Sequence, residues 1–372
     1  MSVARSIAGL VLTALLIAPA MAQDNSFIDL RPKDVQFPDN MEYEDLPIGP
    51  VPNELEAPTD PQGVSNEVFG PRVDEAFGAF QRGYYLTALN LALPRAKNGD
   101  HAAQTLIGEI YSKGLGVPED PKAAADWYAM ASKSGDPLAT FELALLYQDG
   151  RGVEKDRKRA ADLFKTAADA GNMMAKYNLG LLYIEGIYVP PNLLEAAKLI
   201  KEAADAGIAE AQYDYAGMLT EGAGVAPDLV AAAEQFRLAA TAGIVAAEVD
   251  YATVLYLGKG TAQDRPGAVK WYHKAAEAGN PVAQNRYAKL LAAGEGVDAS
   301  LEDAAMWRSL ARRQGLNDPM LDKLLVSIRP EELTRAEERA RFWPSSPPTQ
   351  VAENQPAATP AASASDAPKV SP

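Results

Sequence analysis

The sequence predicts an all-α fold, a solenoid built from antiparallel helix pairs, and two observations support that prediction. The first is an internal repeat in which glycine recurs every 36 residues without insertion, at Gly99, Gly135, Gly171, Gly207, Gly243, Gly279 and Gly315. The second is a composition rich in alanine, leucine and charged residues, which favours helix over strand. A period of this length is typical of proteins that stack one helical unit many times.

Three further sets of equivalent positions, which we call columns, share this 36-residue register. One alanine column lies four residues after the first six glycines, and a second alanine column and a second glycine column follow later in each unit. They are Ala103, Ala139, Ala175, Ala211, Ala247 and Ala283; Ala131, Ala167, Ala203, Ala239, Ala275 and Ala311; and Gly114, Gly150, Gly186, Gly222, Gly258 and Gly294. Their agreement in one register indicates a structural repeat rather than chance.

Each unit is predicted to be a pair of helices, as residues 136–171 illustrate. Asp136 is a suitable N-cap for the first helix, which is expected to end at Gly150 as a left-handed C-cap. After a short loop, Asp156 caps the second helix and Gly171 ends it. A column of small residues is expected to let the two helices approach closely, at Gly108, Ala144, Gly180, Ala216, Ala252 and Ala288. Stacking of neighbouring pairs then completes the core.

The ends of the chain differ from the middle. We expect a degenerate helix pair over 71–99, six 36-residue units over 100–315, and capping helices over 316–343. Residues 23–70 are acidic and rich in proline and are predicted to be a disordered leader, and 344–372 a disordered tail.

Residues 1–22 are typical of a cleavable signal peptide. A short apolar run follows Arg5, and Ala20-Met21-Ala22 fits a cleavage site. The run is too short to cross a bilayer core of about 30 Å as a stable helix, although an uncleaved anchor is the alternative. We therefore expect a periplasmic or secreted protein with no stable membrane insertion after cleavage.

Charge and cysteine content exclude several classes of function. The formal net charge is −15, which disfavours binding to nucleic acid or to anionic lipid. The chain has no cysteine, so it has no disulfide, no thiolate zinc site and no lipid-modified cysteine.

The repeated motif resembles the Sel-1-like repeat, a relative of the tetratricopeptide repeat. The matching residues in the first full unit are Ala103-Gln104, Ile107-Gly108, Tyr111, Gly114-Leu115-Gly116-Val117, Asp120, Ala124, Trp127-Tyr128 and Ala131. The resemblance covers about 99–315 and implies a right-handed α-solenoid of antiparallel helix pairs that mediates protein–protein interaction, often as an adaptor or a periplasmic regulator. One unit departs from the motif, because Tyr188 replaces the second loop glycine and Pro190-Pro191 follows it.

No residue pattern indicates catalysis. His101 and His273 lie far apart in the sequence without a nucleophile motif, and the glycine loops repeat in nearly every unit as structural turns. We therefore expect no enzyme activity, no catalytic residue, no metal and no cofactor, although acid pairs are too abundant for the sequence alone to exclude a glycosidase.

The resemblance also places a binding surface. First helices line the concave face of such solenoids, and the residues that flank their packing columns are apolar in the middle units. The predicted partner-binding residues are Phe141, Leu145, Tyr177, Leu181, Ile184, Tyr213 and Tyr256. Packing against neighbouring repeats is the alternative role for these side chains.

Three functions remain open at this stage. The first is a periplasmic scaffold or regulator that binds a partner protein of unknown identity. The second is a cell-wall (peptidoglycan) binding module or an envelope enzyme. In the third, the leader or the tail occupies the groove of the same chain.

Overall fold

A computed structural model describes residues 74–345, and that part of the chain contains helices but no strand. The predictions for the signal peptide, for the leader and for nearly all of the tail fall outside these residues. The described chain divides after Pro227 into two compact units. We call residues 74–227 the N-terminal unit and residues 228–345 the C-terminal unit, and we describe each by itself.

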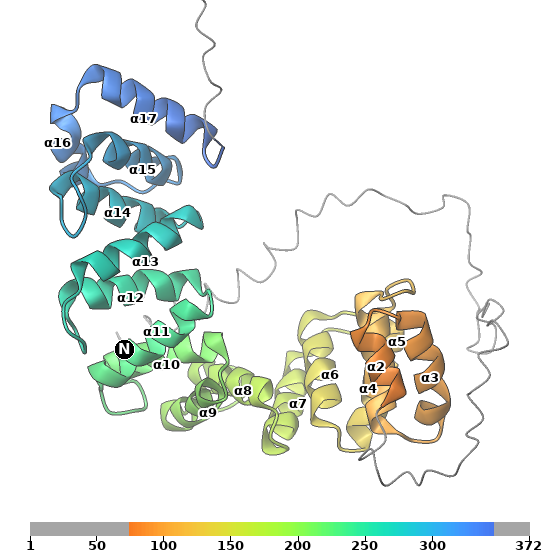
Figure 1. Ribbon diagram of the computed structural model, residues 1–372. Helices are drawn as coiled ribbons and strands as arrows, with labels where there is room; N and C mark the ends of the chain where they lie inside the picture. Colours follow the sequence, from red (N-terminus) through yellow and green to blue (C-terminus); the bar gives the residue numbers. More distant parts are fainter. Residues whose placement is uncertain (1–73, 346–372) are drawn as a thin grey trace, which may run out of the picture. The chain divides into compact units, whose positions relative to one another are not determined.

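In the N-terminal unit each helix packs against the next one in the sequence (Figure 1). Its helices are α2 (Glu75–Gln81), α3 (Tyr85–Lys97), α4 (His101–Lys113), α5 (Pro121–Lys133), α6 (Pro137–Asp149), α7 (Arg157–Asp169), α8 (Met173–Glu185), α9 (Leu193–Asp205) and α10 (Ala209–Glu221). The predicted all-α solenoid of helix pairs is confirmed by this arrangement.

The C-terminal unit continues the same pattern and adds a different end. Its elements are α11 (Leu229–Thr241), α12 (Val245–Leu257), α13 (Arg265–Glu277), α14 (Pro281–Ala293), α15 (Leu301–Arg313), α16 (Pro319–Leu324), the 3₁₀ helix η2 (Leu325–Ser327) and α17 (Pro330–Phe342). The last helix, α17, packs against α15.

Helix ends form where the repeated residues predict them. The Asp136 carboxylate accepts hydrogen bonds from the backbone N–H groups of Leu138 and Ala139, which have no partner within the helix. Gly150 has φ of 77° and its N–H bonds to the carbonyl of Leu146. An L-residue with a side chain adopts such a φ only at a cost, so glycine is favoured at this position.

The small-residue column explains how closely the two helices of a pair approach. A Cβ placed on Gly108 would lie 2.6 Å from Cε1 of Tyr128, and one on Gly180 would lie 2.7 Å from Cγ1 of Ile200. Both distances are shorter than carbon atoms tolerate, so the close approach predicted for this column is confirmed at Gly108 and Gly180.

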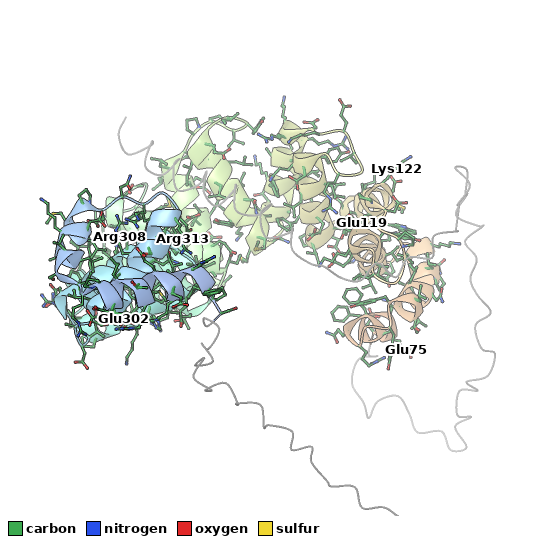
Figure 2. The ribbon with its side chains drawn as sticks, turned by 90° about the horizontal axis from the view of Figure 1, so that it is seen from above. Glu75, Glu119, Lys122, Glu302, Arg308 and Arg313 are labelled. Carbon is green, nitrogen blue, oxygen red and sulfur yellow. The ribbon has the colours of Figure 1, made fainter. Side chains whose placement is uncertain are left out.

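At the end of the C-terminal unit, arginine side chains of α15 connect this helix to α16 and α17. Arg308 is only 3 % exposed, donates to both carboxylate oxygens of Asp322 and donates at 2.6 Å to the carbonyl of Leu316. Arg313 donates at 2.6 Å to the carbonyl of Ala340 on α17. Figure 2 shows Arg308 and Arg313 in this part of the C-terminal unit, with Glu302 near α17. Because Arg308 is buried with its charge paired, removing Asp322 would leave an unpaired buried cation.

Candidate binding site

The second glycine of each loop contacts the preceding helix pair. A Cβ built on Gly152 would overlap the carbonyl group of Pro121, at the start of α5, and a Cβ on Gly224 would overlap the carbonyl of Leu193, at the start of α9. Both glycines also have positive φ. The loop therefore lies directly on the first turn of the preceding second helix, and no side chain fits between the two backbones.

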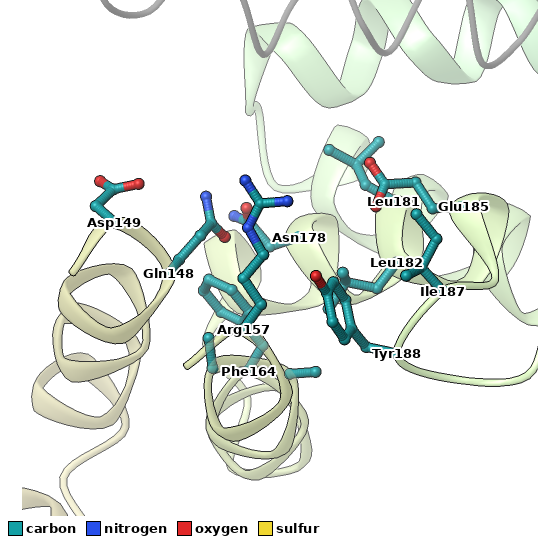
Figure 3. Close-up of a pocket in the computed structure, with 12 residues that line it drawn as sticks. Gln148, Asp149, Arg157, Phe164, Asn178, Leu181, Leu182, Glu185, Ile187 and Tyr188 are labelled. Carbon is teal, nitrogen blue, oxygen red and sulfur yellow. The ribbon is translucent and has the colours of Figure 1, made fainter. Parts of the chain in front are cut away.

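Tyr188 occupies this position in the loop between α8 and α9, and the residue opposite it by the 36-residue register is Arg157. Because a tyrosine cannot take up the glycine contact, the loop cannot lie against α7 in the same way. A cavity of about 450 Å³ lies there, lined by Gln148, Asp149, Arg157, Ala160, Ala161, Phe164, Asn178, Leu181, Leu182, Glu185, Ile187 and Tyr188. We call it the Tyr188 cavity; Figure 3 shows Tyr188 across from Arg157 and Phe164.

The Tyr188 cavity has an apolar interior and a polar rim. Phe164 is 1 % exposed and belongs to the hydrophobic core of the N-terminal unit, so it forms a rigid part of the wall. Leu181 and Leu182 of α8 lie on the opposite side, and Ile187 is largely exposed at the opening. An apolar concave surface with a few polar groups at its edge is typical of binding pockets.

Cations gather beside this cavity at the start of α7. Lys155, Arg157, Lys158 and Arg159 are all exposed. Arg159 lies over the ring of Tyr147, with its guanidinium carbon 4.4 Å from the ring centroid. Among residues 74–345, no carboxylate forms an ion pair with Arg157 or Lys158. The positive end of the helix dipole makes each cation in the first turn unfavourable, by about 0.3–1 kcal/mol, so their presence is not explained by helix stability.

Two of the predicted partner-binding residues are buried. Phe141 is 6 % exposed and its ring centroid lies 5.8 Å from that of Phe164. Tyr177 is 7 % exposed and its hydroxyl donates a hydrogen bond of 2.8 Å to Asp214. Burial raises the pKa of Asp214 to about 6, although the hydrogen bond from Tyr177 acts in the opposite direction.

The other predicted residues are half-buried. Leu145, Leu181, Ile184 and Tyr213 lie on α6, α8 and α10 of the N-terminal unit. Tyr256 lies in the C-terminal unit, where its hydroxyl donates a hydrogen bond of 2.6 Å to Glu295. Of the predicted residues only Leu181 lines the Tyr188 cavity. Sequence reasoning did not nominate Arg157 or Phe164, although it noted the departure at Tyr188.

Both histidines contact other side chains of the repeats. His101 Nδ1 lies 3.1 Å from the carboxylate of Asp136, and the His273 ring packs 4.8 Å from the ring of Tyr287. Within residues 74–345 no cluster of three or more histidine or acidic side chains is arranged to hold a metal ion. In the same part of the chain, no helix has the length and apolarity needed to cross a bilayer.

Comparison with solved structures finds helical-repeat proteins. A Sel1 repeat protein from Oxalobacter formigenes is 31 % identical, with a TM-score of 0.57, and the match covers 65 % of this chain and 100 % of that one. A protective antigen of uropathogenic Escherichia coli with an SLR fold is 26 % identical, with a TM-score of 0.49, over 68 % of this chain and 62 % of that one. No curated protein matches the chain.

The family comparison agrees with the 36-residue register. The model described as "Sel1 repeat" matches residues 101–136, 137–172, 174–208, 209–244, 245–280 and 281–316. These six segments cover more than half of the 372 residues and confirm the resemblance drawn from the motif. The chain belongs to the Sel1 repeat family.

Proposed function

We propose that this protein is an exported scaffold or regulator that binds a partner protein through the first helices of its repeats. Sel1 repeats generally mediate protein–protein interaction. The observation that carries the proposal is a row of half-buried apolar side chains, Leu145, Leu181, Ile184 and Tyr213, on successive first helices of the N-terminal unit. Export follows from the signal peptide predicted for residues 1–22.

The buried and half-buried residues of this surface have different roles in the proposal. Phe141 and Tyr177 pack within the repeats and hold the surface rigid. Leu145, Leu181 and Ile184 offer apolar area that a partner would cover, and Tyr213 adds an aromatic ring. Rigid apolar and aromatic side chains are effective contact residues because their burial costs little conformational entropy. Tyr256 would provide a separate contact within the C-terminal unit.

Site-specific photocrosslinking tests the proposal in the cell. A photoreactive phenylalanine analogue is placed at Ile184 or Tyr213, and at Lys165 or Lys201 on second helices as matched exposed controls. We expect one and the same protein to crosslink from positions 184 and 213 and not from the controls. Equal labelling from all four positions would contradict the proposed surface. Binding of purified peptidoglycan in the absence of any partner would instead favour the cell-wall module.

Two alanine variants separate binding from folding. Leu181→Ala with Ile184→Ala removes half-buried contact area and should weaken capture of the crosslinked partner. Leu179→Ala is the control, since Leu179 is buried on the same helix. Its loss should cost about 2–5 kcal/mol of stability and leave the affinity of the remaining folded protein unchanged.

A further inference from the structure

The Tyr188 cavity is not required by the repeat. Equivalent loops close onto the preceding helix through glycine, as at Gly152 and Gly224, whereas Tyr188 prevents this closure. The result is a concave surface with Phe164 in its wall and, beside it, Arg157 and Lys158, neither of which forms an ion pair within residues 74–345. Its volume of about 450 Å³ lies within the range of about 300–1,000 Å³ that is usual for ligand pockets. Two carboxylates, Asp149 and Glu185, also line the cavity, so the start of α7 is the place where an anionic group of an apolar occupant would pair.

We propose that residues 24–46 of the same chain bind in the Tyr188 cavity. In this arrangement an aromatic side chain of the segment contacts the half-buried Leu181 and Tyr188, and flanking carboxylates pair with Arg157 and Lys158. The segment would then cover Leu181 and restrict access to one part of the proposed partner-binding surface.

The composition of the segment matches the cavity. Residues 24–46 contain seven acidic residues (Asp24, Asp29, Asp34, Asp39, Glu42, Glu44 and Asp45) and two basic ones (Arg31 and Lys33). Each of its aromatic residues, Phe27, Phe37 and Tyr43, lies within two positions of a carboxylate. The other end of the chain does not match, because residues 346–372 contain no aromatic residue and only two acidic ones.

The chain is long enough for this contact. Twenty-seven residues, 47–73, separate the segment from Asp74, which caps α2. They span up to about 90 Å when extended, at about 3.3 Å per residue. Helices α2 and α7 belong to the same unit and are five packing steps apart, or at most about 50 Å at 8–10 Å per step. The linker therefore reaches the cavity without requiring full extension.

Photocrosslinking of the full chain tests the proposal. Because the natural chain has no cysteine, Glu185→Cys provides a single thiol at the cavity for attachment of a benzophenone maleimide. The matched control is Glu221→Cys, 36 residues later in the next pair, where the loop has Gly224. We expect mass spectrometry to find crosslinks from position 185 to residues 24–46. Far fewer crosslinks to this segment are expected from position 221.

Charge variants test whether the segment pairs with Arg157 and Lys158, and isotope mixing tests whether the bound segment belongs to the same chain. Arg157→Glu with Lys158→Glu should abolish the crosslink from position 185, whereas the same charge change on α9, Lys198→Glu with Lys201→Glu, should preserve it. Tyr188→Gly should also abolish it without changing the helical circular dichroism spectrum. In a mixture of ¹⁴N and ¹⁵N chains, crosslinks should join peptides of the same isotope.

The opposite outcomes overturn the proposal. Crosslinks between isotopes would identify a second copy as the occupant, and crosslinks to 346–372 would identify the tail. Retention of the crosslink after reversal at Arg157 and Lys158, or equal crosslinking from positions 185 and 221, would show that residues 24–46 do not bind in the cavity.

Discussion

Two loops of the N-terminal unit, 150–156 and 186–192, have the same ends and different centres. Gly150 and Gly186 both adopt positive φ, and the N–H groups of Asp156 and Asn192 donate to the carbonyls of Tyr147 and Tyr183. At the third residue, however, Gly152 lies against Pro121, whereas Tyr188 borders a cavity. The comparison indicates that the third residue of the loop decides whether the loop lies against the start of the preceding second helix.

Placing a side chain at the closed loop should have the largest effect. Gly152→Ala introduces a Cβ that overlaps the Pro121 carbonyl group at a residue with φ of 69°. The left-handed backbone costs about 1–2 kcal/mol and overpacking about 1–3 kcal/mol, so we expect a loss of roughly 2–5 kcal/mol in urea unfolding.

Gly171→Ala is the control for that substitution. Gly171 has φ of 91°, and a Cβ there has no neighbour within 4 Å, so only the backbone cost of about 1–2 kcal/mol applies. If both variants lose the same stability, the loop contact with Pro121 contributes nothing and the comparison between the loops is wrong.

The burial of Asp214 predicts a pH dependence that the preceding pair lacks, because the residue 36 positions earlier is Asn178. Phe141, the counterpart of Tyr177 one repeat earlier, has no hydroxyl group. Burial raises the pKa of Asp214 to about 6, so the folded state binds this proton more tightly than the unfolded state does. The stability contributed by this proton is therefore full below the unfolded-state pKa near 4 and declines as the pH rises through 6.

Asp214→Asn isolates the contribution of this carboxyl group. The stability of the natural chain relative to the variant should fall by about 2 kcal/mol between pH 4 and pH 7. Urea unfolding at both pH values measures this difference, and subtracting the variant removes titration elsewhere in the molecule. A difference that is constant or rises with pH contradicts the raised pKa.

Restoring glycine to the open loop should have a smaller effect. Tyr188→Gly lets the loop approach Arg157 as Gly152 approaches Pro121, but glycine increases the freedom of the unfolded chain. We expect these effects nearly to offset, with a net change within about 1 kcal/mol. Amide hydrogen exchange should slow at residues 186–192 as the loop closes, and unchanged or faster exchange would show that Tyr188 is not what holds the cavity open.

The repeat, its caps and its close helix contacts could be predicted from the sequence because each depends on residues near one another in the chain. Asp136 and Gly150 act on their own helix ends, and the small residue at Gly108 faces Tyr128 of the same pair. Local chemistry repeated in register therefore suffices for these features.

The cavity could not be predicted because it depends on contact between different pairs. The sequence shows that Tyr188 departs from the pattern, but only the structure shows that its glycine counterparts touch the start of the preceding second helix. Likewise, Phe141 and Tyr177 lie between polar residues in the sequence, and their low exposure follows from stacking that spacing alone does not describe. Contacts between units determine which members of an apolar column remain accessible.

The smallest predicted effect concerns the cations that distinguish α7. Lys158→Glu places an anion in the first turn of the helix, which favours the helix dipole and relieves repulsion from Arg157 and Arg159. We expect a gain of about 0.5 kcal/mol at low ionic strength, decreasing in 1 M salt as the charges are screened. Lys122→Glu, the equivalent change in α5, should gain less because Lys122 has no neighbouring cation in its first turn. A loss of stability at Lys158 would mean that the basic residues support the fold, whereas a gain larger than that of Lys122→Glu would mean that the cluster of cations at this helix start is unfavourable for stability.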